Sequence, residues 1–144
     1  MFKKEEKKQM KIVDKDGKIV ENDIGFVQET LELCKNLTSL ESHHFASYCS
    51  TGDEMFLKLG KIAREKRTKY LKMIAKGDGG QRWCSSKHIC EILMRIQELT
   101  TRCMNTNDVE LAKEISQDQK IFFEMFLEIN GYTSKNITLG NTEA

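Results

Sequence analysis

The three histidines of the chain, His43, His44 and His88, lie in two short polar clusters inside otherwise apolar, helix-forming segments. Histidine titrates near neutral pH and is the commonest metal ligand in proteins, so its position is the best starting point in a search for chemistry. One cluster, residues 41–44, lies late in the first long helical segment, and the other, residues 82–90, opens the third. The two clusters therefore define two candidate sites.

The first cluster contains a Glu-x-x-His motif, Glu41 to His44, which places a carboxylate and an imidazole on one face of a helix. The motif resembles half of the site in ferritin-like di-iron bundles, in which two such motifs and two further glutamates converge. Because the sequence has a single motif of this kind, the hypothesis becomes a mononuclear site for zinc, manganese or iron. The ligands of this divalent metal would be Glu41, His44, Glu98 and Asp118.

Distance along the helices decides whether these side chains meet. An α-helix rises about 1.5 Å per residue, so in an up-and-down bundle all four proposed ligands would lie about 10–18 Å from the same end. The second cluster, with His88, would lie about 27 Å from that end and would form a separate site. Buried carboxylates need partners, and Arg67 and Arg95 lie at heights that could neutralise Glu41 and Asp118. The sequence therefore favours an ion-pair layer over a metal site.

The second cluster begins with Arg82, and His88 follows on the same predicted helix. This Arg-x5-His pattern resembles the Arg-x4-6-His signature of HEPN domains, which are small all-α bundles of similar length. The resemblance covers this motif and the fold class. It implies RNA binding or metal-independent RNA cleavage across a dimer interface, with Arg82 and His88 as the catalytic residues. The alternative is a structural role, in which Trp83 anchors the start of the helix and His88 is half-buried beside Glu91.

Basic residues gather in the second predicted helix. From position 58 to position 76 there are eight lysines and arginines and a single acid, Glu65, whereas the whole chain has a net charge of +1. Five lysines that project away from the apolar face are predicted to bind an anionic partner: Lys58, Lys61, Lys69, Lys72 and Lys76. The partner would be RNA, a phosphate-bearing ligand or an acidic protein. The alternative is a solvated face that pairs with acids on neighbouring helices, such as Glu29 and Glu32.

Composition narrows the class of protein. A chain of 144 residues with 31% charged residues is typical of one globular domain, and no apolar run approaches the roughly 20 residues that span a membrane. The five cysteines form no CxxC pair, and no apolar stretch follows the charged N-terminus, so we expect reduced thiols and a cytoplasmic location. The sequence has no glycine-rich phosphate loop, nucleophile elbow or dinucleotide-binding fingerprint.

Apolar residues at three- and four-residue spacing predict four long helices, and the absence of proline imposes no break on them. The helices are expected at about 22–49, 54–76, 82–104 and 108–129. Capping pairs Thr51/Glu54 and Asn107/Glu110 are expected to begin the second and fourth helices, and Asn130-Gly131 to end the fourth. Short loops make neighbouring helices antiparallel, so the predicted fold is an all-α, up-down-up-down four-helix bundle.

The predicted organisation has three parts. A charged tail and a small β-hairpin occupy residues 1–21, the bundle occupies 22–131, and a disordered tail occupies 132–144. The third helix is apolar nearly all round, so it is either central or part of an interface, and a homodimer is a further hypothesis. The function that the sequence favours is a small binding or interaction protein. The alternatives are the metal-binding bundle and the HEPN-like ribonuclease.

Overall fold

The computed structural model describes residues 10–11, 24–76 and 80–134, and most of this part of the chain is helical. Two β-bridged segments of two residues each, β1 (Met10–Lys11) and β2 (Thr133–Ser134), pair antiparallel near the two ends of the described chain. The helices are, in chain order, α2 (Ile24–Thr51), α3 (Met55–Leu71), α4 (Gln81–Asn105), α5 (Val109–Ser116) and α6 (Asp118–Ile129).

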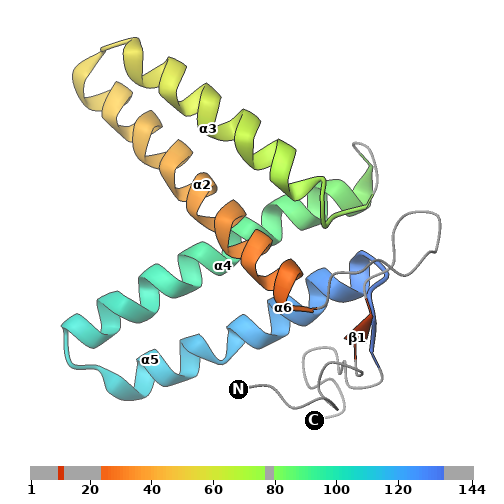
Figure 1. Cartoon of the computed structure of the whole chain (residues 1–144). Coiled ribbons are helices and arrows are strands. Elements are labelled where there is room, and N and C mark those ends of the chain that lie inside the picture. The colour runs from red at the N-terminus through yellow and green to blue at the C-terminus, as the bar shows by residue number, and fades with distance from the viewer. Residues whose placement is uncertain (1–9, 12–23, 77–79, 135–144) are drawn as a thin grey trace.

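The helices form two antiparallel hairpins that cross each other (Figure 1). One hairpin consists of α2 and α3, and the other consists of α4 with α5 and α6, which continue in one direction because Gln117 between them keeps helical angles of φ −65° and ψ −26°. The hairpins meet where α2 passes α4, and from there their loop ends diverge, as Figure 1 shows. The molecule therefore has a shared centre and two separate arms.

The hydrophobic core lies at this crossing. On α2 the apolar residues Val27, Leu31 and Cys34 recur at helical spacing and place one stripe against α4. The stripe packs on apolar residues from the end of the first hairpin and from both helices of the second: Leu71, Ile74, Ile89, Cys90, Leu93, Phe126, Leu127 and Tyr132. Helix α4 packs against α2, α5 and α6. Its buried residues are Ser86, Ile89, Cys90, Leu93, Met94 and Cys103. In the described residues α4 is thus the central helix.

The loop ends use different caps from the predicted ones. Thr51 is the last residue of α2 rather than a cap of α3, and the Asp53 carboxylate accepts a hydrogen bond from the Met55 N–H at 2.9 Å. At the other loop, Asp108 instead of Asn107 is the N-cap, and its carboxylate accepts from the Leu111 N–H at 3.2 Å. Both loops also contain a residue with positive φ, Gly52 at 73° and Asn107 at 63°. The two predicted caps are wrong because Thr51 still belongs to α2 and because Asn107 has a positive φ, whereas an N-cap residue adopts β-region angles.

The end of α6 is closed as predicted. Gly131 has φ of 75°, a conformation that glycine adopts without the steric cost of a Cβ atom. The following residue, Tyr132, donates its N–H to the Leu127 carbonyl at 3.0 Å, the pattern of a Schellman motif. Tyr132 is buried, and its hydroxyl donates to the Ile74 carbonyl beyond the end of α3. Although the sequence analysis placed Tyr132 in the C-terminal tail, it belongs to the core.

The all-α class is confirmed, and the helices within each hairpin are antiparallel as predicted. The four predicted segments do not lie side by side over their full length, because the hairpins cross and then diverge. Helix α3 ends at Leu71, earlier than expected, and the fourth predicted helix is divided at Gln117. The predicted N-terminal β-hairpin falls mostly on residues 12–23, outside the described residues. None of the described helices is long and apolar enough to cross a membrane.

Candidate functional site

A cleft with a volume of about 660 Å³ lies between the two hairpins. It is lined by the second half of α2, by α3, and by the outward face of α4, so its walls come from both hairpins. Volumes of roughly 300–1,000 Å³ are typical of small-molecule sites. The divergence of the arms thus leaves a space of ligand size beside the core.

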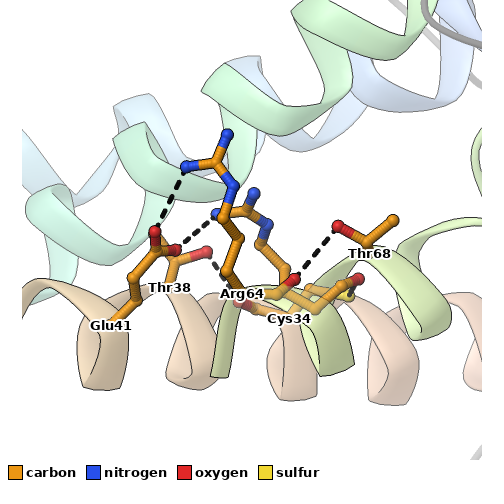
Figure 2. A network of polar contacts seen from close by, with 6 residues as sticks. Cys34, Thr38, Glu41, Arg64 and Thr68 are labelled. Atoms are coloured by element: carbon orange, nitrogen blue, oxygen red, sulfur yellow. Dashed lines mark hydrogen bonds and ion pairs between the residues drawn. The ribbon is translucent and has the colours of Figure 1, made fainter. Parts of the chain in front are cut away.

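An ion-pair cluster lies in one wall of this cleft. The Glu41 carboxylate accepts hydrogen bonds from the Arg67 guanidinium at 3.0 Å and from the Arg64 guanidinium at 3.3 Å. Figure 2 shows the Glu41 carboxylate facing Arg64 across the interface of α2 and α3. The Thr68 hydroxyl donates a hydrogen bond to the Arg64 carbonyl one turn earlier on α3, at 3.0 Å. One carboxylate is therefore shared by two guanidinium groups.

Arg67 is the most unusual member of the cluster because only 3% of its surface is exposed. Its Nε has no hydrogen-bond partner among the described residues, although that atom is buried. A buried cation is costly unless it is paired and its donors are satisfied. The Glu41 carboxylate supplies part of that compensation, but the buried Nε–H of Arg67 has no acceptor among the described residues.

The rest of the cleft combines apolar and polar side chains. Phe45 is 61% exposed and Leu99 is 48% exposed, although both are large apolar residues that line a concave surface. Ser42 on α2 accepts a hydrogen bond from the Arg95 guanidinium on α4, at 3.5 Å. Exposed apolar residues grouped in a depression are typical of binding sites. The arrangement is suited to an amphipathic ligand.

The four predicted metal ligands are dispersed. Glu41 and His44 are neighbours on α2, but Glu41 turns to the two arginines and the His44 ring stacks on Phe56 of α3, with centroids 6.0 Å apart. Glu98 is exposed on α4, and Asp118 is exposed at the start of α6. In the described residues no three histidine, cysteine, aspartate or glutamate side chains lie close enough to hold a metal ion. The metal site is not confirmed and stays a prediction.

The crossing of the hairpins explains this dispersion. In the predicted up-and-down bundle the loop ends of both hairpins lie at one end, whereas Figure 1 shows them on separate arms. Residues at equal heights from the two loops, such as Glu41 and Asp118, are consequently carried apart. The ion-pair interpretation holds for Glu41 with Arg67, but among described residues Asp118 forms no ion pair.

The two residues of the HEPN-like motif lie on the first turns of α4. His88 is exposed and lines the cleft, whereas Arg82 is exposed outside it. Trp83 packs against the core, as the structural alternative predicted, but the half-buried position that the same alternative gave to His88 is wrong. Glu91 also lines the cleft on the same helix as His88. The structure does not test whether Arg82 and His88 act on RNA, so this role stays a prediction.

The five predicted partner-binding lysines lie along α3 and the turn that follows it. Lys58, Lys61, Lys69 and Lys72 are exposed, and Lys76 is half-buried. None of the five forms an ion pair with a described carboxylate, and Lys69 instead lies over the Tyr70 ring at 5.1 Å from its centroid. Glu32, one of the acids expected to neutralise them, pairs with Lys35 at 3.0 Å. The basic face of α3, defined by these five lysines, is thus electrostatically unbalanced within the described part of the chain.

Two buried thiols lie at the crossing, Cys34 on α2 and Cys90 on α4, and neither is exposed. A hydrogen bond to Cys34 and burial in the core together raise the pKa of the Cys90 thiol well above its usual range. Cys90 therefore stays protonated, and in the described structure all five cysteines are free. These two thiols act as small hydrophobic residues of the core.

The cleft itself is not predicted by the sequence. The sequence does predict that Arg67 could neutralise Glu41, and this pair is the polar cluster in the wall of the cleft. Phe45 is a large apolar residue in a helical segment, a type expected in the core, yet it lines the open space where the hairpins diverge. No pattern along one helix reports the angle at which two hairpins cross.

Fold and site together define an all-α protein with a partly apolar, partly charged cleft between two crossed helical hairpins. No protein-family model, curated protein or solved structure matches this chain.

Proposed function

We propose that the protein is a binding protein that holds the phosphate backbone of RNA on the basic face of α3. The observation that carries the proposal is the unbalanced charge of Lys58, Lys61, Lys69, Lys72 and Lys76, which form no ion pair with a described carboxylate. Clustered lysines that neutralise phosphates supply most of the affinity in nucleic-acid binding that does not depend on base sequence.

The position of α3 supports this interpretation. Among the helices α3 packs chiefly against α2, so its opposite side stays open to a large partner. Lysine ammonium groups are compact point charges that suit phosphate oxygens, whereas base recognition uses hydrogen bonds in the grooves or stacking on aromatic rings. Tyr70 is the aromatic residue nearest to this face, and it is only half-exposed. We therefore expect binding without marked base preference.

The test is the salt dependence of binding to an unstructured RNA oligonucleotide. Binding by four exposed lysines predicts a log–log slope of about −3 against salt for a single strand. Replacing Lys58, Lys61, Lys69 and Lys72 by glutamine should abolish most of that slope. The control carries Lys113→Gln and Lys120→Gln, two exposed lysines on the other hairpin, and should bind as the wild type does.

A flat salt response, or equal loss in the control variant, would contradict the proposal. Binding of an acidic protein in place of RNA would show that the face serves a different anionic partner. The same RNA also tests the ribonuclease alternative, which is favoured by the exposure of His88 in a cationic cleft. That alternative predicts cleavage in the presence of a chelator, and loss of the cleavage products with His88→Ala.

Self-association and a cytoplasmic location stay predictions. Several large apolar residues on the first hairpin are exposed, among them Met55, Ile62 and Met73 on and just after α3. Because such residues are more common in interfaces than on free surfaces, light scattering of the purified protein should report the mass of a dimer.

A further inference from the structure

The cleft between the hairpins has an excess of positive charge. Its charged side chains are different residues from the five lysines of the basic face of α3. Four basic side chains line the cleft, Arg64, Arg67, Lys87 and Arg95. Two carboxylates oppose them, those of Glu41 and Glu91. With His88 neutral, the cleft therefore keeps two positive charges without a counterpart.

Arg67 is the buried cation among these charged residues. Its Nη1 donates to Glu41 at 3.0 Å, but its buried Nε has no partner among described residues, and Arg64 draws on the same carboxylate. At the open end, Arg95 reaches only the Ser42 hydroxyl, at 3.5 Å, and neither Arg95 nor Lys87 has an ion pair among the described residues. An incoming anion would thus find unused donors without displacing a native ion pair.

The apolar side chains of the cleft indicate that the bound anion carries an apolar group. Phe45 on α2 faces the apolar surface of α4 that includes Ile92, Ile96 and Leu99. Because these side chains are left in water, the hydrophobic effect favours a ligand that covers them. A volume of about 660 Å³ fits a single small molecule rather than a partner helix that runs the length of the arms.

From these observations we propose that the cleft binds an alkyl phosphate monoester, with the phosphate at Arg95 and the Glu41–Arg64–Arg67 cluster and the alkyl chain against Phe45 and Leu99. A phosphate monoester has a charge of about −1.5 to −2 at pH 7, which matches the two unbalanced positive charges. Guanidinium groups bind phosphate in a bidentate manner, and the Ser42 hydroxyl adds a donor. This inference goes beyond the proposed RNA binding and does not depend on it.

Decyl phosphate is the probe, used below the concentration at which it aggregates, with calorimetry and thermal unfolding as readouts. The proposal predicts saturable binding of one molecule per chain. Decanoate, with a single charge, and decanol, with none, should each bind at least about ten-fold more weakly, or ~1.4 kcal/mol. Inorganic phosphate, which lacks the chain, should be weaker still. Decanoate or decanol binding as tightly as decyl phosphate would overturn the assignment.

Two exposed positions test the geometry without removing core contacts. Arg95→Gln and Phe45→Ala should each weaken decyl phosphate about ten-fold. Their matched controls are Arg102→Gln on α4 and Leu40→Ala on α2, which are exposed residues outside the cleft and should leave affinity unchanged. Unchanged affinity in both cleft variants, or absence of saturable binding, would refute the site.

The lysine variants of α3 separate this inference from the proposed function. They should bind decyl phosphate as the wild type does while losing RNA. A protein that binds RNA but no alkyl phosphate would refute the cleft site alone, and the converse would refute only the RNA proposal.

Discussion

Asn130 is fully buried, and its side chain joins three separate parts of the chain. Its Oδ1 accepts from the Lys76 N–H at 2.7 Å, and its Nδ2 donates to the Ser86 hydroxyl at 2.9 Å and to the Phe126 carbonyl at 2.8 Å. The sequence analysis identified Asn130 only as part of a helix stop. Its hydrogen bonds to partners far along the chain could not be predicted, because local patterns carry no information on which segments meet.

Replacing Asn130 by alanine should lower the free energy of unfolding by about 2–4 kcal/mol, because buried donors and acceptors lose their partners. Urea unfolding followed through the fluorescence of Trp83, the single tryptophan, measures the change. The control, Asn105→Ala at the exposed end of α4, should cost less than about 0.5 kcal/mol. Similar losses in the two variants would show that the Asn130 network adds little to stability.

At the scale of the elements, the α2/α3 hairpin depends on a close approach of the two helices at Gly60. A Cβ atom at Gly60 would lie 3.6 Å from the His44 Cβ and 3.8 Å from the Glu41 carbonyl oxygen, which are ordinary van der Waals distances. The position is within α3, where glycine costs conformational entropy relative to alanine. There is therefore room for one methyl group and no more.

Gly60→Ala should raise the free energy of unfolding by about 0.5–1 kcal/mol, since it restores helix propensity without a clash. Gly52→Ala provides the opposite control, because Gly52 has φ of 73° and alanine there should destabilise the protein. Differential scanning calorimetry reports both changes. A loss of stability with Gly60→Ala would mean that the hairpin tolerates less than these distances imply.

The sequence predicts the positions of the helices well, but it does not predict how they begin, where one of them breaks or how the hairpins cross. Spacing of apolar residues predicts the helices, because helix formation depends on neighbours along the chain, and the short loops predict their antiparallel pairing. The caps at Asp53 and Asp108 and the break at Gln117 were not predicted, since one-residue shifts of a loop decide them. The candidate cleft depends on the crossing of two hairpins, which is fixed by contacts between residues far apart in sequence, such as Lys35 and Gln97 at 3.3 Å.

At the scale of the whole molecule, stability should fall in alkaline solution because of Tyr132. Burial raises the pKa of the Tyr132 hydroxyl well above its ordinary value of about 10. Above pH 10 the unfolded chain releases this proton while the folded chain retains it. The stabilisation is therefore complete below pH 10, and it decreases by about 1.4 kcal/mol per pH unit as pH rises toward the folded-state pKa.

Tyr132→Phe should remove this component of the pH dependence. At pH 8 the variant should be about 1 kcal/mol less stable than the wild type, because the hydrogen bond to the Ile74 carbonyl is lost, and the difference should shrink or reverse at pH 11. Urea titrations at the two pH values measure it, with Tyr48→Phe as control, since the Tyr48 hydroxyl makes no hydrogen bond to a described residue. An equal gap at both pH values would be inconsistent with a raised pKa.

Each hairpin is a contiguous stretch of chain, and the two meet at a single crossing. The two helical segments of each hairpin are joined by one short loop, so the entropy lost in closing that loop is small. Domains dominated by such local contacts fold in microseconds to milliseconds. We therefore expect the two hairpins to form early and independently, and their docking through Val27, Cys34 and Ile89 to be the step that sets the folding rate.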